Sequence, residues 1–318
     1  MVAMDDLFNP YYVDIVVFWM IYLLLGLGLN LITGYAGQVS LGHAAFYGIG
    51  AYTSVILSVK YGWNAWLSMA AAVVVTFLIS ALFGLPSLRV REDFLAITTL
   101  GLGLIAQSFF KNADITGGAY GIDSIPAPSL FGTPLKNTGY LLLVTVVLIV
   151  AVVIMKKMTG SRIGRAWMTI REDETVAQSM GINTTYYKVL VFAIGGAYAG
   201  AAGALFAHKV SFISGESFGF TVSATVLSMV VLGGLSSIFG TFFGVTLLYM
   251  LPEMFRLFEF ELVDPKYLDT YKMMLYGILM VLIMRYRPKG LFGKNGTKLV
   301  NIRRSAVKTL DKGGDRVA

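Results

Sequence analysis

The sequence has no cysteine and only two histidines among its 318 residues. Without cysteine there is no disulfide, thiol nucleophile or cysteine-based metal site. Two histidines far apart do not give the ligand spacing of a zinc site, so no metal-binding residues are predicted. The sequence also lacks a phosphate loop, a catalytic triad pattern and paired acids; its one Gly-Lys pair is followed by Asn295. These absences argue against an enzyme, against a cofactor bound by this chain, and against ATP hydrolysis by the chain itself.

Charged residues are also scarce. They make up 14% of the chain against 56% hydrophobic residues, whereas a soluble domain carries about 25% charge. No Asp, Glu, Lys or Arg lies near the centre of a long apolar run. Proton relays and voltage sensors need ionisable groups inside the membrane. Their absence argues against a proton-coupled carrier or a voltage-gated channel, and only weakly against a sodium-coupled carrier, because carbonyls and hydroxyls can hold sodium.

The apolar residues gather in long runs that are typical of membrane-spanning helices. About 20 such residues are needed to cross about 30 Å of hydrocarbon. The runs predict an all-α, polytopic transmembrane helix bundle with about nine spans (about eight to ten). The predicted spans cover residues 15–32, 39–59, 66–85, 94–110, 139–155, 189–207, 220–236, 238–256 and 272–284. Only Ser236 and Ser237 join the seventh span to the eighth, so these two segments could instead form a re-entrant pair.

The distribution of Lys and Arg predicts the orientation, because cytoplasmic loops carry an excess of both. With the basic loop 156–188 in the cytoplasm, 18 of the 25 basic residues fall on the inner side. The N-terminus is therefore expected outside and the C-terminus in the cytoplasm. The net charge of +7 is explained by this orientation rather than by nucleic-acid binding.

Two regions are distinguished along the chain. Residues 1–290 are predicted to form the transmembrane domain, and residues 291–318 a basic cytoplasmic tail that lies along the anionic inner leaflet or is disordered. The first run follows a segment without Lys or Arg, so it is expected to stay as a helix rather than to be removed as a secretory signal. The outer loops 111–138 and 257–271 are either ordinary solvated loops or contacts for a soluble partner.

Glycines at helical spacing predict closely packed helices. Small residues four apart let helix backbones approach each other in lipid, where apolar side chains alone give little drive to associate. Simple packing explains most of these glycines, and a functional alternative is that the packed faces slide or rock during alternating access. The packing candidates are Gly196, Gly200 and Gly203 in the sixth span and Gly240 and Gly244 in the eighth.

A polar, glycine-rich stretch, GYAGQVSLGHAAFYGIGAY (34–52), opens the second span. Such a stretch is tolerated at membrane depth only where it is buried in protein or lines water. It is therefore a candidate for the translocation path, while a hydrogen-bonded histidine at a helix interface would explain His43 more simply. The candidate residues are Gly37, Gln38, Ser40, Leu41, Gly42 and His43.

The loop 156–188 contains a predicted amphipathic helix that begins near Ile170. Ile170, Val176, Ala177 and Met180 are expected to share its apolar side. Acids at its start suit the positive end of the helix dipole, and Gly181 is expected to end it. Such a helix on the cytoplasmic face could receive the push of a motor subunit, or it could merely anchor the loop at the membrane surface.

Six segments together resemble the LivM-type permeases of bacterial branched-chain amino acid ABC importers. They occur in the family's order and are spread over most of the chain. Two small departures are Ser236, where the family usually has Gly, and Thr241, near which it often has Pro. The matching segments are residues 29–52, TGGAYGI (116–122), GRAWMTIREDETVAQSMGIN (164–183), GGAYAGAAGAL (195–205), VLGGLSSIFGTFFG (231–244) and RPKGLFG (287–293).

The resemblance implies a multi-pass permease of the bacterial plasma (inner) membrane. It implies a second, related permease as partner, two cytoplasmic ATPase subunits that use ATP and Mg²⁺, and an external solute-binding protein. By position it implies that the ATPase-coupling loop contains Gly164, Arg165, Arg171, Glu172, Asp173, Ala177 and Gly181.

The expected function is import of branched-chain amino acids, driven by ATP that is hydrolysed on other chains. A path without fixed charges suits a zwitterion that is neutral overall. One alternative keeps this architecture and carries urea or a short-chain amide. Another is a carrier coupled to an ion gradient, or a channel, that acts alone.

Overall fold

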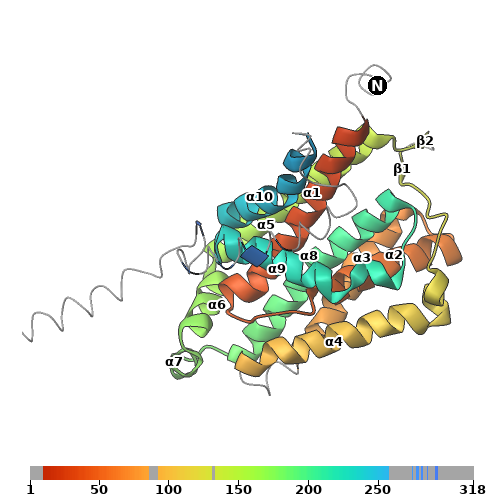
Figure 1. Cartoon of the computed structure of the whole chain (residues 1–318). Coiled ribbons are helices and arrows are strands. Elements are labelled where there is room, and N and C mark those ends of the chain that lie inside the picture. The colour runs from red at the N-terminus through yellow and green to blue at the C-terminus, as the bar shows by residue number, and fades with distance from the viewer. Residues whose placement is uncertain are drawn as a thin grey trace, which may run out of the picture.

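The computed structural model describes residues 10–85, 92–130 and 133–257, together with isolated positions between 274 and 292. Helices account for most of these residues, as Figure 1 shows. The α-helices are α1 (Pro10–Leu29), α2 (His43–Val55), α3 (Ala65–Gly84), α4 (Glu92–Asn112), α5 (Asn137–Gly160), α6 (Arg162–Glu172), α7 (Glu174–Ser179), α8 (Thr184–Val210), α9 (Phe220–Gly233) and α10 (Ile238–Leu257). Two π-helical turns, η2 (Asn30–Tyr35) and η3 (Ile56–Lys60), continue α1 and α2, and three 3₁₀ turns are η5 (Asp114–Thr116), η6 (Gly118–Tyr120) and η7 (Gly215–Phe218).

Helices α1 and α8 lie at the centre of the bundle. In the most apolar 18-residue stretch of each helix, 67% of the residues are buried, compared with 22% in α4 and α5. Pro10 stands at the first helical position of α1, where its missing N–H and fixed φ do no harm. α8 makes its most extensive contacts with α3, α2 and α1. The two central helices therefore form the inner wall against which the others pack.

Glycines of α8 allow these close contacts. A Cβ on Gly196 or Gly200 would overlap the side chains of Ser80 and Thr76 on α3. A Cβ on Gly203 would overlap the carbonyl oxygen of Tyr47 on α2. Similarly, a Cβ on Gly244 of α10 would lie 2.7 Å from the Cα of Gly233 on α9. The spacing of small residues thus corresponds to helix pairs whose backbones nearly touch.

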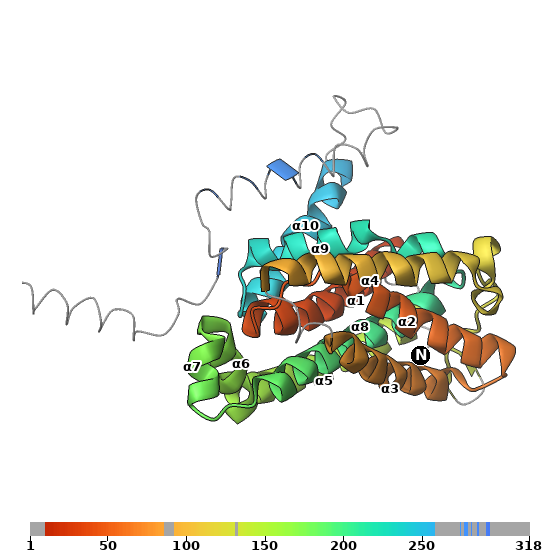
Figure 2. The same cartoon turned by 90° about the horizontal axis from the view of Figure 1, so that it is seen from below.

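Figure 2 shows how the helices surround α1 and α2. α3, α5 and α8 lie on one side of them, and α4, α9 and α10 lie on the other. At the end where α1 begins, Lys209 of α8 pairs with Asp14 of α1 at 2.6 Å and donates to Asn137 at the start of α5 at 3.0 Å. A small two-stranded sheet, β1 (Ser129–Leu130) with β2 (Thr133–Pro134), lies in the loop that precedes α5.

The described residues contain six helices that are long and apolar enough to cross a membrane. They are Pro10–Tyr35, Ala65–Gly84, Phe94–Asn112, Asn137–Gly160, Thr184–Val210 and Gly215–Gly233. They correspond to the first, third, fourth, fifth, sixth and seventh predicted spans. The eighth predicted span corresponds to α10, whose apolar part, Ile238–Met250, is shorter than these six helices. The predicted ninth span, 272–284, and the tail lie largely outside the described residues. The all-α membrane bundle is therefore confirmed, while the number nine and the orientation stay predictions.

The second predicted span, 39–59, differs from a simple membrane helix. Its α-helical part, α2, has 13 residues, and 11 of them are buried. The segment contains several Gly, Ser and Tyr residues and His43, and it lies inside the bundle between α3, α4 and α8. Its polar side chains are compatible with the membrane because protein surrounds them.

Candidate functional site

A helical hairpin, formed by α6 and α7, follows α5 at the end of the bundle remote from the start of α1 (Figure 1). Ser161 begins α6, because its side chain accepts a hydrogen bond from Ile163 N at 3.2 Å. Trp167 and Ile170 are at most 1% exposed, while Arg165 points outward. Trp167 Nε1 donates to the carbonyl of Tyr187 at 2.9 Å, which fastens α6 to the start of α8. The hairpin is thus attached to the core through one face of α6.

The single helix predicted from Ile170 is wrong in two respects. Asp173 breaks it, because its carboxylate caps a second helix by accepting from Thr175 N at 2.8 Å and Val176 N at 3.0 Å. Ile170 and Ala177 are buried, but Val176 and Met180 are 49% and 70% exposed, since the break rotates α7 relative to α6.

The predicted helix end at Gly181 is confirmed. Gly181 has φ +80°, and its N–H donates to Gln178 O at 2.9 Å. The N–H of Ile182 donates to Ala177 O at 3.0 Å, which completes a Schellman motif. Lys188 of α8, whose side chain is 6% exposed, holds Glu174 of α7 at 2.6 Å.

Arg171, the last basic residue of α6, extends from the hairpin toward the core. Its guanidinium donates to the carbonyl of Gly34 at 2.6 Å and to the hydroxyl of Ser236. The stem of Arg171 lies over Gly37, where a Cβ would come within 2.8 Å of Arg171 Cγ. Burial lowers the pKa of Arg171 and the nearby Glu172 raises it, but an arginine remains charged at any physiological pH. A fixed positive charge therefore holds the end of the first helix and the turn between α9 and α10.

The carbonyl of Gly34 is free to accept these bonds because it lies at the end of η2, where helix carbonyls lose their partners. Ser236 Oγ also donates to it, at 2.6 Å. Ser236 itself has φ +62°, a left-handed conformation that favours Gly. This geometry explains why a glycine suits position 236, and why a serine there gains a contact that glycine lacks.

Asn30 ties the same elements together from inside. It is fully buried at the start of η2. Its side-chain carbonyl accepts from Ser236 N at 3.0 Å, and its amide donates to Ser237 O at 3.1 Å and to Thr241 Oγ1 at 2.7 Å. We refer to Asn30, Gly34, Arg171, Ser236, Ser237 and Thr241 as the helix-end cluster. Its members are polar and mutually hydrogen-bonded, so it positions three separate segments of chain.

The irregular segment 36–42 follows the cluster and leads into α2. Leu41 N donates to Thr99 Oγ1 of α4 at 3.0 Å. Ala44 N donates to Ser223 Oγ of α9 at 2.8 Å, which supplies a cap for α2 from another helix. A Cβ on Gly42 would overlap the carbonyl of Thr99, so α4 passes directly against the segment.

Three side chains of this segment carry polar atoms with no hydrogen-bond partner among the described residues. Gln38, Ser40 and His43 are each at most 1% exposed. The unpaired atoms are both amide atoms of Gln38, the hydroxyl of Ser40 and Nδ1 of His43. His43 Nε2 lies 3.2 Å from the carbonyl of Leu25, so that nitrogen is the donor and Nδ1 is left as an acceptor. Buried unpaired polar atoms are costly and call for an explanation.

The structure thus brings part of the predicted site together. Arg171, from the coupling set, touches Gly37, from the path set. The other coupling residues lie elsewhere on the hairpin. Gly164 packs against the end of α5 and Ala177 is buried, while Arg165, Glu172, Asp173 and Gly181 are exposed. Asn30 and Gly34 were missed. A lone Asn inside an apolar run was the available signal for Asn30, and Ser236 and Thr241 stood out only as departures from a pattern.

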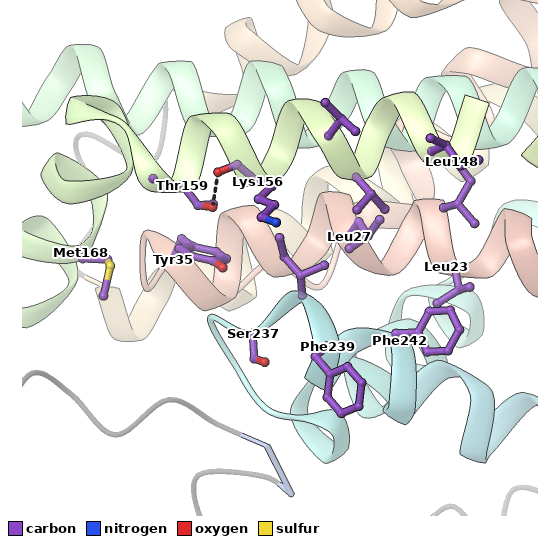
Figure 3. Close-up of a pocket in the computed structure, with 15 residues that line it drawn as sticks. Leu23, Leu27, Tyr35, Leu148, Lys156, Thr159, Met168, Ser237, Phe239 and Phe242 are labelled. Carbon is purple, nitrogen blue, oxygen red and sulfur yellow. Dashed lines mark hydrogen bonds between the residues drawn. The ribbon is translucent and has the colours of Figure 1, made fainter. Parts of the chain in front are cut away.

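An apolar groove of about 840 Å³ runs beside the helix-end cluster, between α1, α5 and α10 (Figure 3). Leu23 and Leu27 of α1, Leu148 and Val152 of α5, and Phe239 and Phe242 of α10 line most of it. The groove becomes polar at the hairpin end, where Tyr35, Lys156, Thr159 and Ser237 line it.

Comparisons with known proteins agree on one family. The family described as branched-chain amino acid transport system / permease component matches residues 11–284. The high-affinity branched-chain amino acid transport system permease protein LivM of Salmonella typhimurium is 39% identical over 304 residues, which cover 88% of this chain and 69% of that protein. LivM of Escherichia coli K12 is 38% identical over the same shares.

A more distant relative is the permease protein LivH of Salmonella typhimurium, which is 26% identical over 86% of this chain and 91% of its own length. No solved structure matches the chain. Together with the apolar helices described above, these similarities show that the chain is a multi-pass membrane protein and belongs to the family of branched-chain amino acid transport system permease components.

Proposed function

We propose that this chain is the permease subunit of an ATP-binding-cassette importer of branched-chain amino acids. Its relatives carry this function in their names. The chain works with a second, related permease, with two cytoplasmic ATPase subunits that use ATP and Mg²⁺, and with an external solute-binding protein. It lies in the bacterial inner membrane with its N-terminus outside and its C-terminus in the cytoplasm.

The contact of Arg171 with Gly34 and Ser236 is the observation that carries the mechanism. In this proposal the exposed side of the hairpin, including Glu172 and Asp173, docks on an ATPase subunit. Arg171 projects the other way and holds the helix-end cluster. A displacement of the hairpin is thereby transmitted to the end of α1 and to the turn between α9 and α10.

The irregular segment 36–42 is the part of the translocation path in this chain. Gln38, Ser40 and His43 offer donors and acceptors that the described protein leaves unpaired. When the helices around them part, these atoms become available to water and to the polar groups of an amino acid. Thr99 of α4 holds Leu41 within the segment and Ser223 of α9 holds Ala44 directly after it, so movement of either helix would disturb the segment.

Reconstitution tests the proposal. The chain is inserted into liposomes with the second permease and the ATPase subunits, and uptake of radiolabelled leucine is measured with the binding protein outside. Uptake that requires both ATP and binding protein is expected. Uptake by the chain alone, or uptake that an ionophore abolishes while ATP is absent, would refute it. Uptake of urea or acetamide in place of leucine would retain the architecture and change the substrate.

A further inference from the structure

The groove between α1, α5 and α10 has the chemistry of an amphiphile site rather than of an amino acid site. Its walls are apolar over two turns of each flanking helix, for example along Leu23 and Leu27, which lie one turn apart on one face of α1. Among the described residues that line it, Lys156 is the charged one, and it stands at one end. A zwitterionic amino acid would need an acceptor for its ammonium group, and the described lining includes no carboxylate. We infer that the groove binds one anionic phospholipid of the surrounding bilayer.

The position of Lys156 supports this assignment. α5 carries no charged residue before Lys156, and Lys156 and Lys157 stand about one turn before its end at Gly160, where the hairpin begins. A lysine at the end of a membrane helix lies at the depth of the lipid headgroups. Figure 3 shows the Lys156 side chain extending from α5 into the polar end of the groove, near Tyr35. Its ammonium group can therefore meet a phosphate that enters from the adjacent leaflet.

Hydroxyl groups at the same end complete the headgroup site. Thr159 donates to the carbonyl of Lys156 at 3.3 Å and also lies within hydrogen-bonding reach of the Tyr35 side chain, and the hydroxyls of Tyr35 and Ser237 add polar atoms beside Lys156. The acyl chain follows Val152, Leu148 and Leu23 toward the bilayer centre. The acyl chain is already in the apolar phase of the bilayer before it binds, so its packing in the groove alone gives little preference for one lipid over another. The headgroup therefore determines which lipid is retained.

To test whether the groove prefers an anionic lipid, the full-length chain is purified in a mild detergent. It is then mixed with equal amounts of phosphatidylglycerol and phosphatidylcholine that carry the same acyl chains. Native mass spectrometry measures which lipid remains bound. The wild type is expected to prefer phosphatidylglycerol. Lys156→Gln is expected to reduce that preference about fivefold, the effect of one basic residue at an anionic surface. The matched control is Lys157→Gln, which removes a neighbouring charge that does not line the groove.

A second pair of variants tests the apolar part without altering charge. Val152→Trp fills the groove and is expected to reduce retention of both lipids, whereas Val146→Trp, on an exposed position of α5 outside the groove, is not. Equal retention in Val152→Trp and Val146→Trp, or a headgroup preference that survives Lys156→Gln, would overturn the inference.

The absence of cysteine allows one further test in the assembled transporter. Val152→Cys introduces the single thiol of the chain, which can carry a photoreactive crosslinker. Crosslinking to lipid is expected. Crosslinking to the second permease would show that protein covers the groove and would overturn the inference, while leaving the proposed transport function untouched.

Discussion

Replacing Arg171 with Met tests whether the hairpin drives the core through the helix-end cluster. The substitution keeps most of the apolar stem of the side chain but removes the guanidinium and with it the two hydrogen bonds to Gly34 and Ser236. Hydrogen bonds from a charged donor contribute about 1.5–3 kcal/mol each. Because Arg171 is partly exposed, water replaces part of this contribution. The substitution is therefore expected to weaken the contact between the hairpin and the helix-end cluster by about 1–3 kcal/mol in total. A coupling energy of that size corresponds to an effect of about 5- to 150-fold.

Two measurements separate coupling from docking. ATPase retention is scored by affinity purification of the variant complex, and uptake is scored in proteoliposomes at saturating ATP. Arg171→Met is expected to retain the ATPase subunits and to lose uptake by the factor above, because its guanidinium points toward the core. Arg162→Met is the matched control on the same helix, since Arg162 is exposed at the start of α6 and lies outside the coupling set, and it is expected to change uptake less than about twofold.

Unchanged uptake in Arg171→Met would mean that the contact transmits nothing. Loss of ATPase retention would place Arg171 on the docking surface instead. A double-mutant cycle with Ser236→Ala sharpens the result, because both residues donate to the carbonyl of Gly34. The losses of coupling free energy in the two single variants should differ from additivity by about 1 kcal/mol or more, as expected for groups in one hydrogen-bond network. Simple additivity would contradict a shared network.

Further predictions concern the hairpin and the core. The double change Glu172→Lys with Asp173→Lys should abolish ATPase retention and leave membrane insertion normal. Arg171→Met, in contrast, should retain the ATPase subunits. Retained transport in the double variant would mean that the hairpin only anchors the loop. Asn30→Leu should lower the free energy of unfolding by about 3–5 kcal/mol, because it leaves buried partners unsatisfied, and a fall in the melting temperature in detergent measures this. Gly203→Ala should cost about 1–3 kcal/mol in the same assay, since the methyl overlaps Tyr47 O, and an unchanged melting temperature would show that α8 and α2 separate readily.

The helical bundle could be predicted from the sequence because long apolar runs allow few structures in a membrane. Six of the predicted spans correspond to long apolar helices. The second predicted span does not form such a helix. Its apolar content indicates that the segment is buried, but it does not distinguish burial in lipid from burial in protein. α2 is buried by other helices rather than by lipid, as its glycines and polar residues indicated, but these residues do not show which helices surround it.

The hairpin was only partly predictable. Its place in the loop and its end at Gly181 follow from local rules, because a glycine with positive φ is a local requirement. The break at Asp173 was also a local signal, an acid that can cap the next helix, but it was interpreted as helix interior. The exposure of Val176 and Met180 follows from that one error in phase.

The contacts of the helix-end cluster could not be predicted, although Arg171 was named and single members such as Asn30 carried a sequence signal. Asn30 and Ser236 are separated by more than 200 residues, and only the packing of α1 against α9 and α10 brings them together. A sequence pattern reports periodicity within one helix, whereas this cluster depends on where three chain segments end. Arg171 was named as a candidate through a family resemblance, and its partners Gly34 and Ser236 were not.

The chemistry of the cluster bears on how a permease can move without losing its fold. Apolar contacts between helices change gradually as the helices slide, whereas hydrogen bonds to a single carbonyl are directional and weaken steeply once the geometry is lost. The Gly34 carbonyl receives bonds from Arg171 and Ser236, and it lies on η2, a π-helical turn, where a helix is less regular. A small displacement of α6 can therefore break the contact while α1 stays packed against α8. In the proposed mechanism the hairpin therefore holds the end of α1 in one position and releases it in the other, while the buried part of α1 keeps the bundle intact.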